Sequence, residues 1–390
     1  MIGPFGLHPK QTMRSRALGL ARPLVARGHA VRLLMPPWDT PDEADRAWTE
    51  DGVELRYVPL RGGAAGITRR LVDETVAWRP DVVHAFKPKA YSGFVAEWLW
   101  RFHRRRLRLV MDTDDWEGAG GWNDVAPYSA LPKRLFARQE RYGLTHAHAV
   151  TVASRTLESI VWSLGMPRDR VTYVPNGPGI PLAAVTPHER EAARARLGLG
   201  ARPTVLVYSR LFEFDTARLV AVLAGVRVAV PEVAVLLVGA GLYAEDSARF
   251  RAQLDAAGLL GTVVDAGWVA LEALPATLAA ADVGLYLMDD TLLNRAKCPV
   301  KLADMLAAGV PVAAEAVGQV TEYVRDGRTG VLVASGDVTG LIWGMVGLLK
   351  DAGSPGSGGA GERREAARVD VIERFGWERL ATILEQAYSG

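Results

Sequence analysis

Short apolar runs alternate with longer amphipathic stretches along almost the whole chain, and this alternation constrains the fold more than any other feature. In the first half the apolar runs span 30–35, 53–59, 81–85, 107–111, 149–152 and 171–174. Helical patterns at 12–27, 88–102 and 129–146 lie between them. A strand–helix–strand rhythm predicts a parallel sheet with helices on both faces.

The same rhythm then starts again. The second series of apolar runs spans 204–209, 233–239, 262–266, 283–287, 310–314 and 330–333. Pro175–Pro181, between the two series, is rich in Pro and Gly and is predicted to be an interdomain linker. We therefore expect an α/β protein with two doubly wound domains facing across a cleft, and ligands beyond the carboxyl ends of the strands. The Gly/Ser-rich segment 353–361 is expected to be a surface loop.

Composition narrows the class of protein. The 46 basic and 44 acidic residues leave a charge of +2, too balanced for a protein that coats nucleic acid. The single cysteine, Cys298, excludes an internal disulfide framework and suits a reducing compartment. The start of the chain lacks a signal-peptide pattern, and the apolar run 219–243 is broken by charged residues and proline. These features predict a cytoplasmic globular protein.

A predicted helix that follows one of the apolar runs carries candidate ligand-binding side chains near its N-terminus. Lys301 and Asp304 are three residues apart and share a helical face. A lysine at a helix N-terminus suits a phosphate, and a carboxylate one turn later can accept hydrogen bonds from ribose hydroxyls. The same spacing also fits an ion pair on a solvated helix.

The run Lys301–Val312, with its Met-Leu-Ala-Ala-Gly-Val-Pro-Val ending, resembles the hallmark of retaining GT-B glycosyltransferases of family 4, the group 1 type. Matching segments occur in the family's order at 174–177, 209–211, 238–241, 281–283, 318–322 and 326–330. This resemblance implies two Rossmann-like halves, here 1–178 for the acceptor and 179–375 for the sugar donor, with the last helix, 376–390, packing back on the first half.

The resemblance also assigns roles to individual residues. Arg210 would hold the nucleotide diphosphate, and Asp304 stands where the family has a ribose-binding glutamate. Gly318, Glu322 and a glycine loop around Gly6 would also meet the sugar donor. Arg210 and Asp304, together with Asp112, are the expected catalytic residues. The strand that should precede the glycine loop is nearly absent from the sequence, and Thr12 is expected to cap the following helix.

Two positions depart from the family pattern. Asp215 replaces a lysine that usually follows the arginine by five residues, and Ala296 replaces a glutamate eight residues before Asp304. Lys297 or Lys301 can supply the missing positive charge, and Asp289 or Asp290 the missing carboxylate. These departures support an alternative hypothesis of a non-catalytic subunit that binds sugar nucleotides or a partner protein.

The expected acceptor site follows two strands of the first half. His84 and Lys87 follow one of them, and relatives carry a histidine-containing motif there. After the next strand, Asp112 stands where many relatives have a histidine. Carboxylates can bind sugar hydroxyls and tryptophans can stack on a sugar ring, which makes Asp114, Asp115, Trp116 and Trp122 further candidates. The loop also fits a charged surface turn whose tryptophans pack inward.

The aromatic and basic segment 98–108 has two explanations. It fits a helix C-terminus with arginines favoured by the helix dipole, and it also fits contact with an anionic membrane surface, such as the inner face of the cytoplasmic membrane.

The resulting hypothesis is a retaining, metal-independent glycosyltransferase that needs no cofactor and uses a UDP-, GDP-, ADP- or dTDP-sugar. Its acceptor would be a hydroxyl of a glycan, a lipid-linked saccharide or a small glycoside. A dinucleotide oxidoreductase is disfavoured because no Gly-x-Gly-x-x-Gly turn follows an opening strand.

Overall fold

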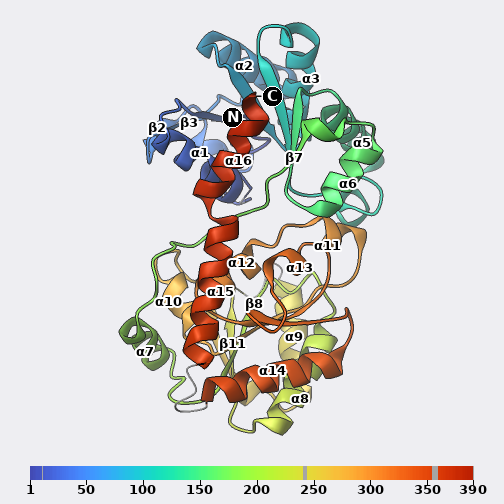
Figure 1. The fold of residues 1–390 in the computed structure, drawn as a ribbon. Coiled ribbons are helices and arrows are strands. Elements are labelled where there is room, and N and C mark those ends of the chain that lie inside the picture. The colour runs from blue at the N-terminus through green and yellow to red at the C-terminus, as the bar shows by residue number, and fades with distance from the viewer. Residues whose placement is uncertain (11, 240–243, 354–358, 390) are drawn as a thin grey trace. The chain divides into compact units, whose positions relative to one another are not determined.

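The computed structural model describes residues 1–10, 12–239, 244–353 and 359–389. The chain divides into two compact units (Figure 1). Unit 1 comprises Met1–Gly177, Thr291–Cys298 and Trp377–Gly390, and unit 2 comprises Pro178–Asp290 and Pro299–Gly376. An eight-residue segment from the second half of the sequence, 291–298, therefore folds as part of unit 1. Residues 354–358 of the predicted Gly/Ser loop lie outside the described residues.

The sheet of unit 1 contains all six strands predicted for the first half, plus one more. Its strands are β1 (Arg32–Met35), β2 (Ala47–Glu50), β3 (Val53–Tyr57), β4 (Val82–Phe86), β5 (Arg108–Thr113), β6 (Ala149–Val152) and β7 (Val171–Tyr173). They run in the orders β1-β3-β2 and β4-β5-β6-β7, and only β2 is antiparallel to its neighbour. Ile2 joins the two groups through bridges to Leu34 of β1 and Ala85 of β4. The edge strand β2 escaped prediction because it carries no apolar run and no buried residue.

Helices cover both faces of this sheet. One face packs against α2 (Gly63–Trp78), α3 (Ala90–His103) and α6 (Arg155–Ser163), and the other against α1 (Leu18–Ala26) and α16 (Trp377–Ser389). The remaining helices of the unit are η1 (Met13–Ala17), η2 (Pro41–Glu43), α4 (Trp122–Val125), α5 (Ala130–Thr145), η3 (Arg168–Arg170) and α11 (Leu292–Ala296). Thr12 does not cap η1, contrary to the prediction, because its own backbone is already helical and its side chain bonds no helix amide.

Unit 2 contains a six-stranded, wholly parallel sheet. The strands are β8 (Thr204–Tyr208), β9 (Ala234–Val238), β10 (Val263–Gly267), β11 (Val283–Tyr286), β12 (Val312–Glu315) and β13 (Gly330–Val333), in the order β10-β9-β8-β11-β12-β13. All six were predicted. Chain order reverses between β8 and β11, so the carboxyl ends of these two strands form the crevice where such sheets bind ligands.

The helices of unit 2 also form two layers. Helices α8 (Thr216–Ala229), α9 (Ala244–Ala256) and α14 (Val338–Gly353) contribute to the apolar core on one face of the sheet. The other helices are α7 (Pro187–Arg196), η4 (Leu260–Thr262), α10 (Leu274–Ala279), α12 (Val300–Ala307), α13 (Val320–Tyr323) and α15 (Gly359–Phe375).

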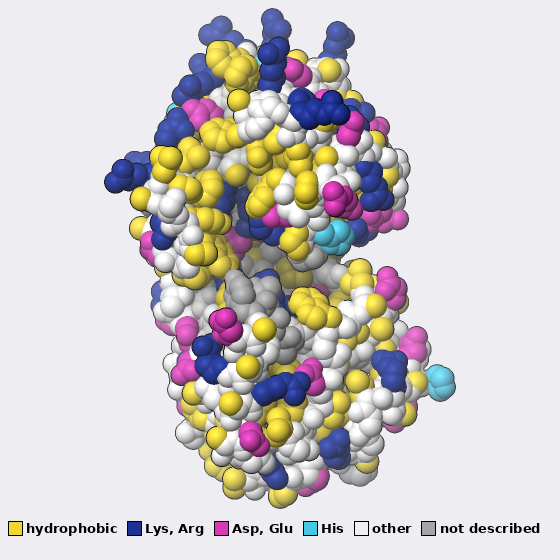
Figure 2. Space-filling model, turned by 180° about the vertical axis from the view of Figure 1, so that it is seen from behind, with side chains coloured by type: hydrophobic (Ala, Val, Ile, Leu, Met, Phe, Trp, Pro, Cys, Tyr) yellow, Lys and Arg dark blue, Asp and Glu magenta, His cyan; other side chains and the backbone are white. Residues whose placement is uncertain are grey.

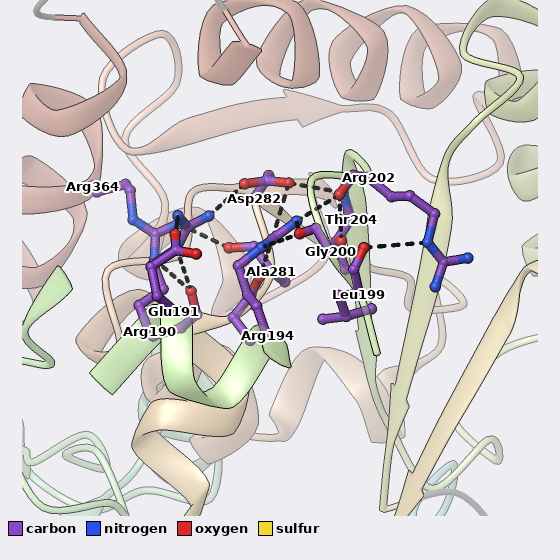
Figure 3. Close-up of polar contacts among 12 residues, drawn as sticks. Arg190, Glu191, Arg194, Leu199, Gly200, Arg202, Thr204, Ala281, Asp282 and Arg364 are labelled. Atoms are coloured by element: carbon purple, nitrogen blue, oxygen red, sulfur yellow. Dashed lines mark hydrogen bonds and ion pairs between the residues drawn. The ribbon is translucent and has the colours of Figure 1, made fainter. Parts of the chain in front are cut away.

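Arginines fix the amino ends of the central strands of unit 2 (Figure 3). Arg190 of α7 donates to Asp282 at 2.6 Å, and Asp282 in turn accepts from the backbone N–H of Thr204, where β8 begins. Arg194 and Arg364 donate to backbone carbonyls of 279–281 and of 200–202. This cluster lies at the end of the sheet opposite the crevice and serves the fold.

Candidate active site

Arg210 lies just beyond the carboxyl end of β8, at the crevice of unit 2. The residue after it, Leu211, adopts a positive φ of 61° while its side chain is buried in the core. This backbone conformation is costly for leucine, so core packing holds the sharp turn that follows Arg210. The Nε of Arg210 is buried and has no hydrogen-bond acceptor among the described residues. Its guanidinium lies 4.9 Å from the centre of the Phe212 ring.

Lys301, in the first turn of α12, lies near Arg210. Burial and the positive charge of Arg210 lower the pKa of Lys301 to about 8. Its ammonium lies 4.9 Å from the centre of the Tyr208 ring. Within the described residues it forms no ion pair, although the nearby carboxylates of Glu213 and Asp304 partly offset the lowering of its pKa. Lys301 lines a small hollow together with Tyr208, Ser209, Glu213, Phe214 and Tyr286. Two cations that form no ion pair with any described residue, at a strand switch point, suit a bound diphosphate.

Asp304, one turn further along α12, is buried and bound by the linker. Its Oδ1 accepts from the backbone N–H of Gly179 at 2.6 Å, and the N–H of Ile180 also donates to this carboxylate. Burial raises the pKa of Asp304 to about 7. The carboxylate therefore fixes the chain where it enters unit 2, and it does not pair with Lys301.

The two departures from the family pattern have structural explanations. Asp215 is the N-cap of α8, where its Oδ1 accepts from the N–H of Ala217 at 2.9 Å. Arg218, in the first turn of α8, is not a substitute for the missing lysine, because Asp289 and the buried Glu315 both accept from it. Asp289 is thereby engaged in this ion pair as well.

Gly318 and Glu322 lie in the turn after β12. Gly318 has a φ of 50°, which favours glycine, and leads into the single turn of α13. Glu322 is half-buried within α13, and its backbone carbonyl accepts from Arg374 of α15 at 2.6 Å.

Ala296 and Lys297 belong to the segment that folds with unit 1. Ala296 is fully buried in the core of that unit, and its carbonyl accepts from Ser154 at 2.7 Å. A glutamate at this position would bury a charge. The ammonium of Lys297 lies 5.1 Å from the centre of the Trp122 ring. Lys297 thus lies in unit 1, whereas Arg210 and Lys301 lie in unit 2.

Asp112, at the end of β5, is completely buried and forms a bidentate ion pair with Arg16 of η1. Nε and Nη2 of Arg16 donate to the two carboxylate oxygens at 2.7 Å each, and Thr151 donates to Oδ2 at 2.6 Å. Arg16 also donates to Asn176 in the linker at 2.9 Å. Burial by itself would raise the pKa of Asp112, but the charge of Arg16 outweighs it and lowers this pKa. Both oxygens of Asp112 are therefore used inside the protein.

His84 is equally inaccessible. Its Nδ1 lies 2.8 Å from the hydroxyl of Tyr388 in α16, and its Nε2 lies 3.0 Å from Oγ1 of Thr151. Burial lowers the pKa of His84 to about 3, so the imidazole is neutral. His84 ties the C-terminal helix to the sheet and presents no face to a ligand.

The lysines after β4 are paired with carboxylates of the loop after β5. Lys87 lies 3.1 Å from Asp114 and 2.5 Å from Asp115, and Lys89 lies 2.6 Å from Glu117. Burial would lower the pKa of Lys87, but Asp114 and Asp115 outweigh it and raise this pKa. The sequence placed Lys87, Asp114 and Asp115 in one site, and the structure shows them in contact with one another. Glu117, the partner of Lys89, was not among the predicted site residues.

The two tryptophans of this loop differ in their surroundings. Trp116 packs against the core, donates from Nε1 to the carbonyl of Ala119, and lies under Gly118 and Gly121, where a Cβ would clash with it. Trp122 is half-buried and forms a hydrogen bond with Asp115. Trp116 is half-buried as well, so the two rings differ in their partners and not in their exposure.

Gly6 is buried, and a Cβ at this position would come within 3.0 Å of the Tyr57 hydroxyl. That hydroxyl accepts from the N–H of Leu7 at 2.8 Å, so Tyr57 fixes the glycine loop. Tyr57, like Arg16 and Tyr388, was missed by sequence reasoning. Arg16 lies in an amphipathic, arginine-rich stretch and shows no local sign of being buried.

Among the described residues, no cluster of three or more His, Cys, Asp or Glu side chains suits a metal ion. Within the same residues, no helix combines the length and the apolar character needed to cross a bilayer.

Comparison with known proteins identifies the family. A glycosyl transferase 4-like domain model matches residues 11–177, and a glycosyl transferases group 1 model matches residues 202–351. The GDP-mannose-dependent alpha-(1-6)-phosphatidylinositol monomannoside mannosyltransferase of Mycolicibacterium smegmatis is 30% identical over 94% of this chain and 92% of its own. The 2-deoxystreptamine N-acetyl-D-glucosaminyltransferase of Streptomyces fradiae is 26% identical over 79% of this chain and 70% of its own.

Solved structures share the fold at low sequence identity. Anabaena HepE in complex with UDP and glucose superposes with a TM-score of 0.73 at 18% identity, covering 100% of this chain and 98% of HepE. The catalytic domain of starch synthase IV from Arabidopsis thaliana, bound to ADP and acarbose, gives 0.74 at 15% identity over 100% and 98% of the two chains. The two mainly parallel sheets, the motif order and these likenesses agree, and the chain belongs to the group 1 glycosyltransferases of the GT-B fold.

Proposed function

We propose that this protein is a retaining glycosyltransferase that transfers a sugar from a nucleoside diphosphate sugar to an acceptor hydroxyl. The observation that carries the proposal is the pair Arg210 and Lys301. Both lie at the strand switch point of unit 2, and neither forms an ion pair among the described residues, although the charges of Glu213 and Asp304 act on Lys301. A leaving diphosphate develops negative charge, which two such cations stabilise.

In this proposal Arg210 is the catalytic residue, and Lys301 and the Gly318 turn bind the sugar donor. Glu322, which follows that turn, would bind the same ligand. Asp304 acts by holding the linker, and Asp112 by holding Arg16; both are positioning residues. The bond from the sugar C1 to the diphosphate breaks, the acceptor oxygen bonds to C1 on the same face, and the acceptor proton passes to the departing phosphate. No step requires a metal ion.

The test begins with a thermal-shift screen against UDP-, GDP-, ADP- and dTDP-sugars, since related proteins use GDP-mannose or are solved with UDP or ADP. Arg210→Ala is expected to lower turnover at least 100-fold. Lys350→Ala, at an exposed position of α14, is the control. Turnover that survives Arg210→Ala, or a screen without any binder, would refute the assignment of the sugar-donor site. The anomeric configuration of the product, read by NMR, tests retention.

We further propose that the end of α3 contacts an anionic membrane surface. Trp98 and Phe102 are exposed, with 66% of Phe102 accessible, and the exposed residues Arg104–Arg106 follow them. Figure 2 shows Lys and Arg side chains projecting from unit 1 at the top of the view, beside hydrophobic side chains. Such a segment gains about 1 kcal/mol per basic residue near anionic lipid. In a flotation assay, the wild-type protein should float with phosphatidylglycerol vesicles. The triple variant Arg104→Glu, Arg105→Glu, Arg106→Glu should remain unbound. Equal binding of the wild-type protein to phosphatidylcholine vesicles would contradict the proposal.

A further inference from the structure

The turn between β4 and α3 in unit 1 contains two residues with a strained backbone. Lys87 and Ala90 each have a φ of 52°. This left-handed conformation is costly for a residue with a Cβ atom. Such strain persists only where the surrounding structure imposes it, and it is concentrated at functional sites. The turn 87–90 follows the carboxyl end of β4, which is the end of a parallel sheet where ligands bind.

Gln139 of α5 imposes the conformation of Ala90. The Gln139 side chain is buried, its Oε1 accepts from the backbone N–H of Ala90 at 2.8 Å, and its Nε2 donates to the carbonyl of Ala90 at 3.0 Å. A Cβ on Gly93 of α3 would come within 2.9 Å of the Gln139 carboxamide, so α3 packs directly against it. One buried side-chain amide therefore binds both polar backbone groups of a strained residue.

Two further contacts hold the rest of the turn. The buried hydroxyl of Ser92 donates to the carbonyls of Lys87 and Lys89. A Cβ on Gly143 of α5 would come within 2.6 Å of the Pro88 ring, so Pro88 is in tight contact with that helix. Helices α3 and α5 thus hold the turn in a conformation that its own residues disfavour.

The conformation of the turn decides where two ammonium groups lie. Lys87 contacts Asp114 and Asp115, and Lys89 contacts Glu117, all three in the loop after β5. Because the turn provides the cations and the neighbouring loop provides the carboxylates, a shift of the turn displaces the loop as well.

The loop after β5 carries side chains that suit a sugar. The carboxylate of Asp115 is partly exposed and forms a hydrogen bond with Trp122. The ammonium of Lys297 lies 5.1 Å from the centre of the Trp122 ring, and its charge acts on Asp115. A carboxylate, an ammonium and an indole side by side offer an acceptor and a donor for hydroxyl groups and a ring for stacking.

We infer that Gln139 is a positioning residue of the acceptor site. By holding Ala90 in the left-handed conformation, it keeps the lysines of the turn against the loop after β5, where the acceptor binds. Gln139 touches no substrate and acts through the turn. This inference rests on the proposed glycosyltransferase function. It names a residue inside an amphipathic helix to which no sequence motif pointed.

The first experiment removes the two hydrogen bonds and then the strain. Gln139→Met keeps the length of the side chain but releases Ala90, so hydrogen exchange in 87–93 and 112–124, measured by mass spectrometry, should be faster than in the wild-type protein. Adding Ala90→Gly should slow this exchange again by about fivefold, because glycine adopts a positive φ without support. Wild-type exchange in a folded Gln139→Met protein would overturn the inference. So would a loss of protection that Ala90→Gly does not restore, since Gln139 would then act through packing alone.

The second experiment connects the turn to the acceptor. With the sugar nucleotide found in the screen, Gln139→Met should raise the KM for myo-inositol or methyl mannoside by about tenfold and leave the KM for the sugar nucleotide unchanged. Gln386→Met, at an exposed position of α16, is the matched control. An unchanged acceptor KM, or an equal rise in both KM values, would overturn the inference. Hydrolysis of the sugar nucleotide without acceptor reports on the proposed function alone, and the exchange measurement decides the inference if neither acceptor is used.

A stability measurement needs no ligand. Ala90→Gly by itself should raise the thermal unfolding temperature by about 2 °C, because it removes the cost of a positive φ and keeps the backbone groups that Gln139 binds. Ala137→Gly, at an exposed position inside α5, is the matched control and should lower that temperature. A lower unfolding temperature for Ala90→Gly would overturn the inference, even if Gln139→Met did not fold.

Discussion

At the scale of single residues, the role of a cationic side chain depends on whether a carboxylate of the protein already neutralises its charge. Arg16 and Lys87 are buried and paired, and they hold the fold of unit 1. Arg210 and Lys301 are close to each other and unpaired among the described residues, which is electrostatically unfavourable until an anion binds. Unfavourable charge placement of this kind is typical of functional sites.

The pKa of Lys301 predicts how binding of a nucleoside diphosphate depends on pH. Its pKa of about 8 means that the ammonium loses its proton as the pH rises through that value. A diphosphate binds the charged form better, so the dissociation constant should be lowest below pH 8 and should increase above it, by up to about tenfold per pH unit. Calorimetric titration between pH 6.5 and 9.5 measures this, with UDP or whichever nucleotide the screen selects.

Lys301→Arg should flatten this profile, because arginine stays charged throughout the range. Lys350→Arg, on an exposed position of α14, should leave the profile as it is in the wild-type protein. A dissociation constant that stays constant from pH 7 to 9.5 in the wild-type protein would contradict the assignment.

The ion pair of Asp112 and Arg16 predicts a stability effect. Asp112→Asn leaves a buried guanidinium without its counter-charge and should lower the free energy of unfolding by about 3 kcal/mol or more. The double variant Arg16→Leu, Asp112→Leu should recover a large part of that loss, because it removes both charges. Urea unfolding measures both changes.

Asp265→Asn is the control for this cycle. Asp265 forms an exposed ion pair with Arg251, and such pairs contribute about 0–1 kcal/mol. If Asp112→Asn lowered the free energy of unfolding no more than Asp265→Asn does, the buried ion pair would not be important for stability.

At the scale of elements, helix contacts override helix propensity. Gly19 lies inside α1, where a Cβ would come within 2.8 Å of the Trp377 ring in α16. Alanine is intrinsically about 1 kcal/mol better than glycine in a helix. The close contact between α1 and α16 therefore explains why glycine is needed at this position.

Gly19→Ala should accordingly lower the thermal unfolding temperature, since the propensity gain is outweighed by the clash with the Trp377 ring, which packs against the core. Gly347→Ala is the matched control, because Gly347 lies inside α14 and a Cβ there meets nothing within 4 Å. That variant should raise the unfolding temperature slightly. Differential scanning fluorimetry distinguishes the two, and a stabilised Gly19→Ala protein would contradict the packing of α16 on α1.

At the scale of the whole molecule, the two units do not follow the order of the sequence. The segment 291–298 interrupts unit 2 and folds with unit 1, where Ala296 is buried and Cys298 accepts from the N–H of Asn176 at 3.1 Å. The helix α12 that carries Lys301 begins only two residues later, in unit 2.

Hydrogen exchange should reveal this division. Adding the nucleoside diphosphate should slow exchange in 207–211 and 299–304, which carry the proposed phosphate ligands and their supports. Residues 291–298 should keep the exchange rate of the free protein, because their protection comes from the fold of unit 1. Mass-spectrometric exchange with and without nucleotide measures this, and increased protection confined to unit 1 would contradict the placement of the sugar-donor site.

The sequence by itself determined the strand series and the identity of the fold. All twelve predicted apolar runs are strands, because buried parallel strands must be continuously apolar and stand out from amphipathic helices. Motif order identified the family, as the comparisons confirm. Strand β2 was missed because an exposed antiparallel edge strand carries no such apolar run.

Only the tertiary structure decided which polar residues face inward. Asp112 and Arg16 are 96 positions apart in the sequence. Lys87 reaches Asp115, 28 positions away, only because β4 and β5 are neighbouring strands. Sequence spacing predicted that polar side chains gather at strand ends, and it could not tell a buried ion pair from an exposed ligand site. That difference depends on partners from distant elements, since a buried charge is stable only where the fold supplies its counter-charge.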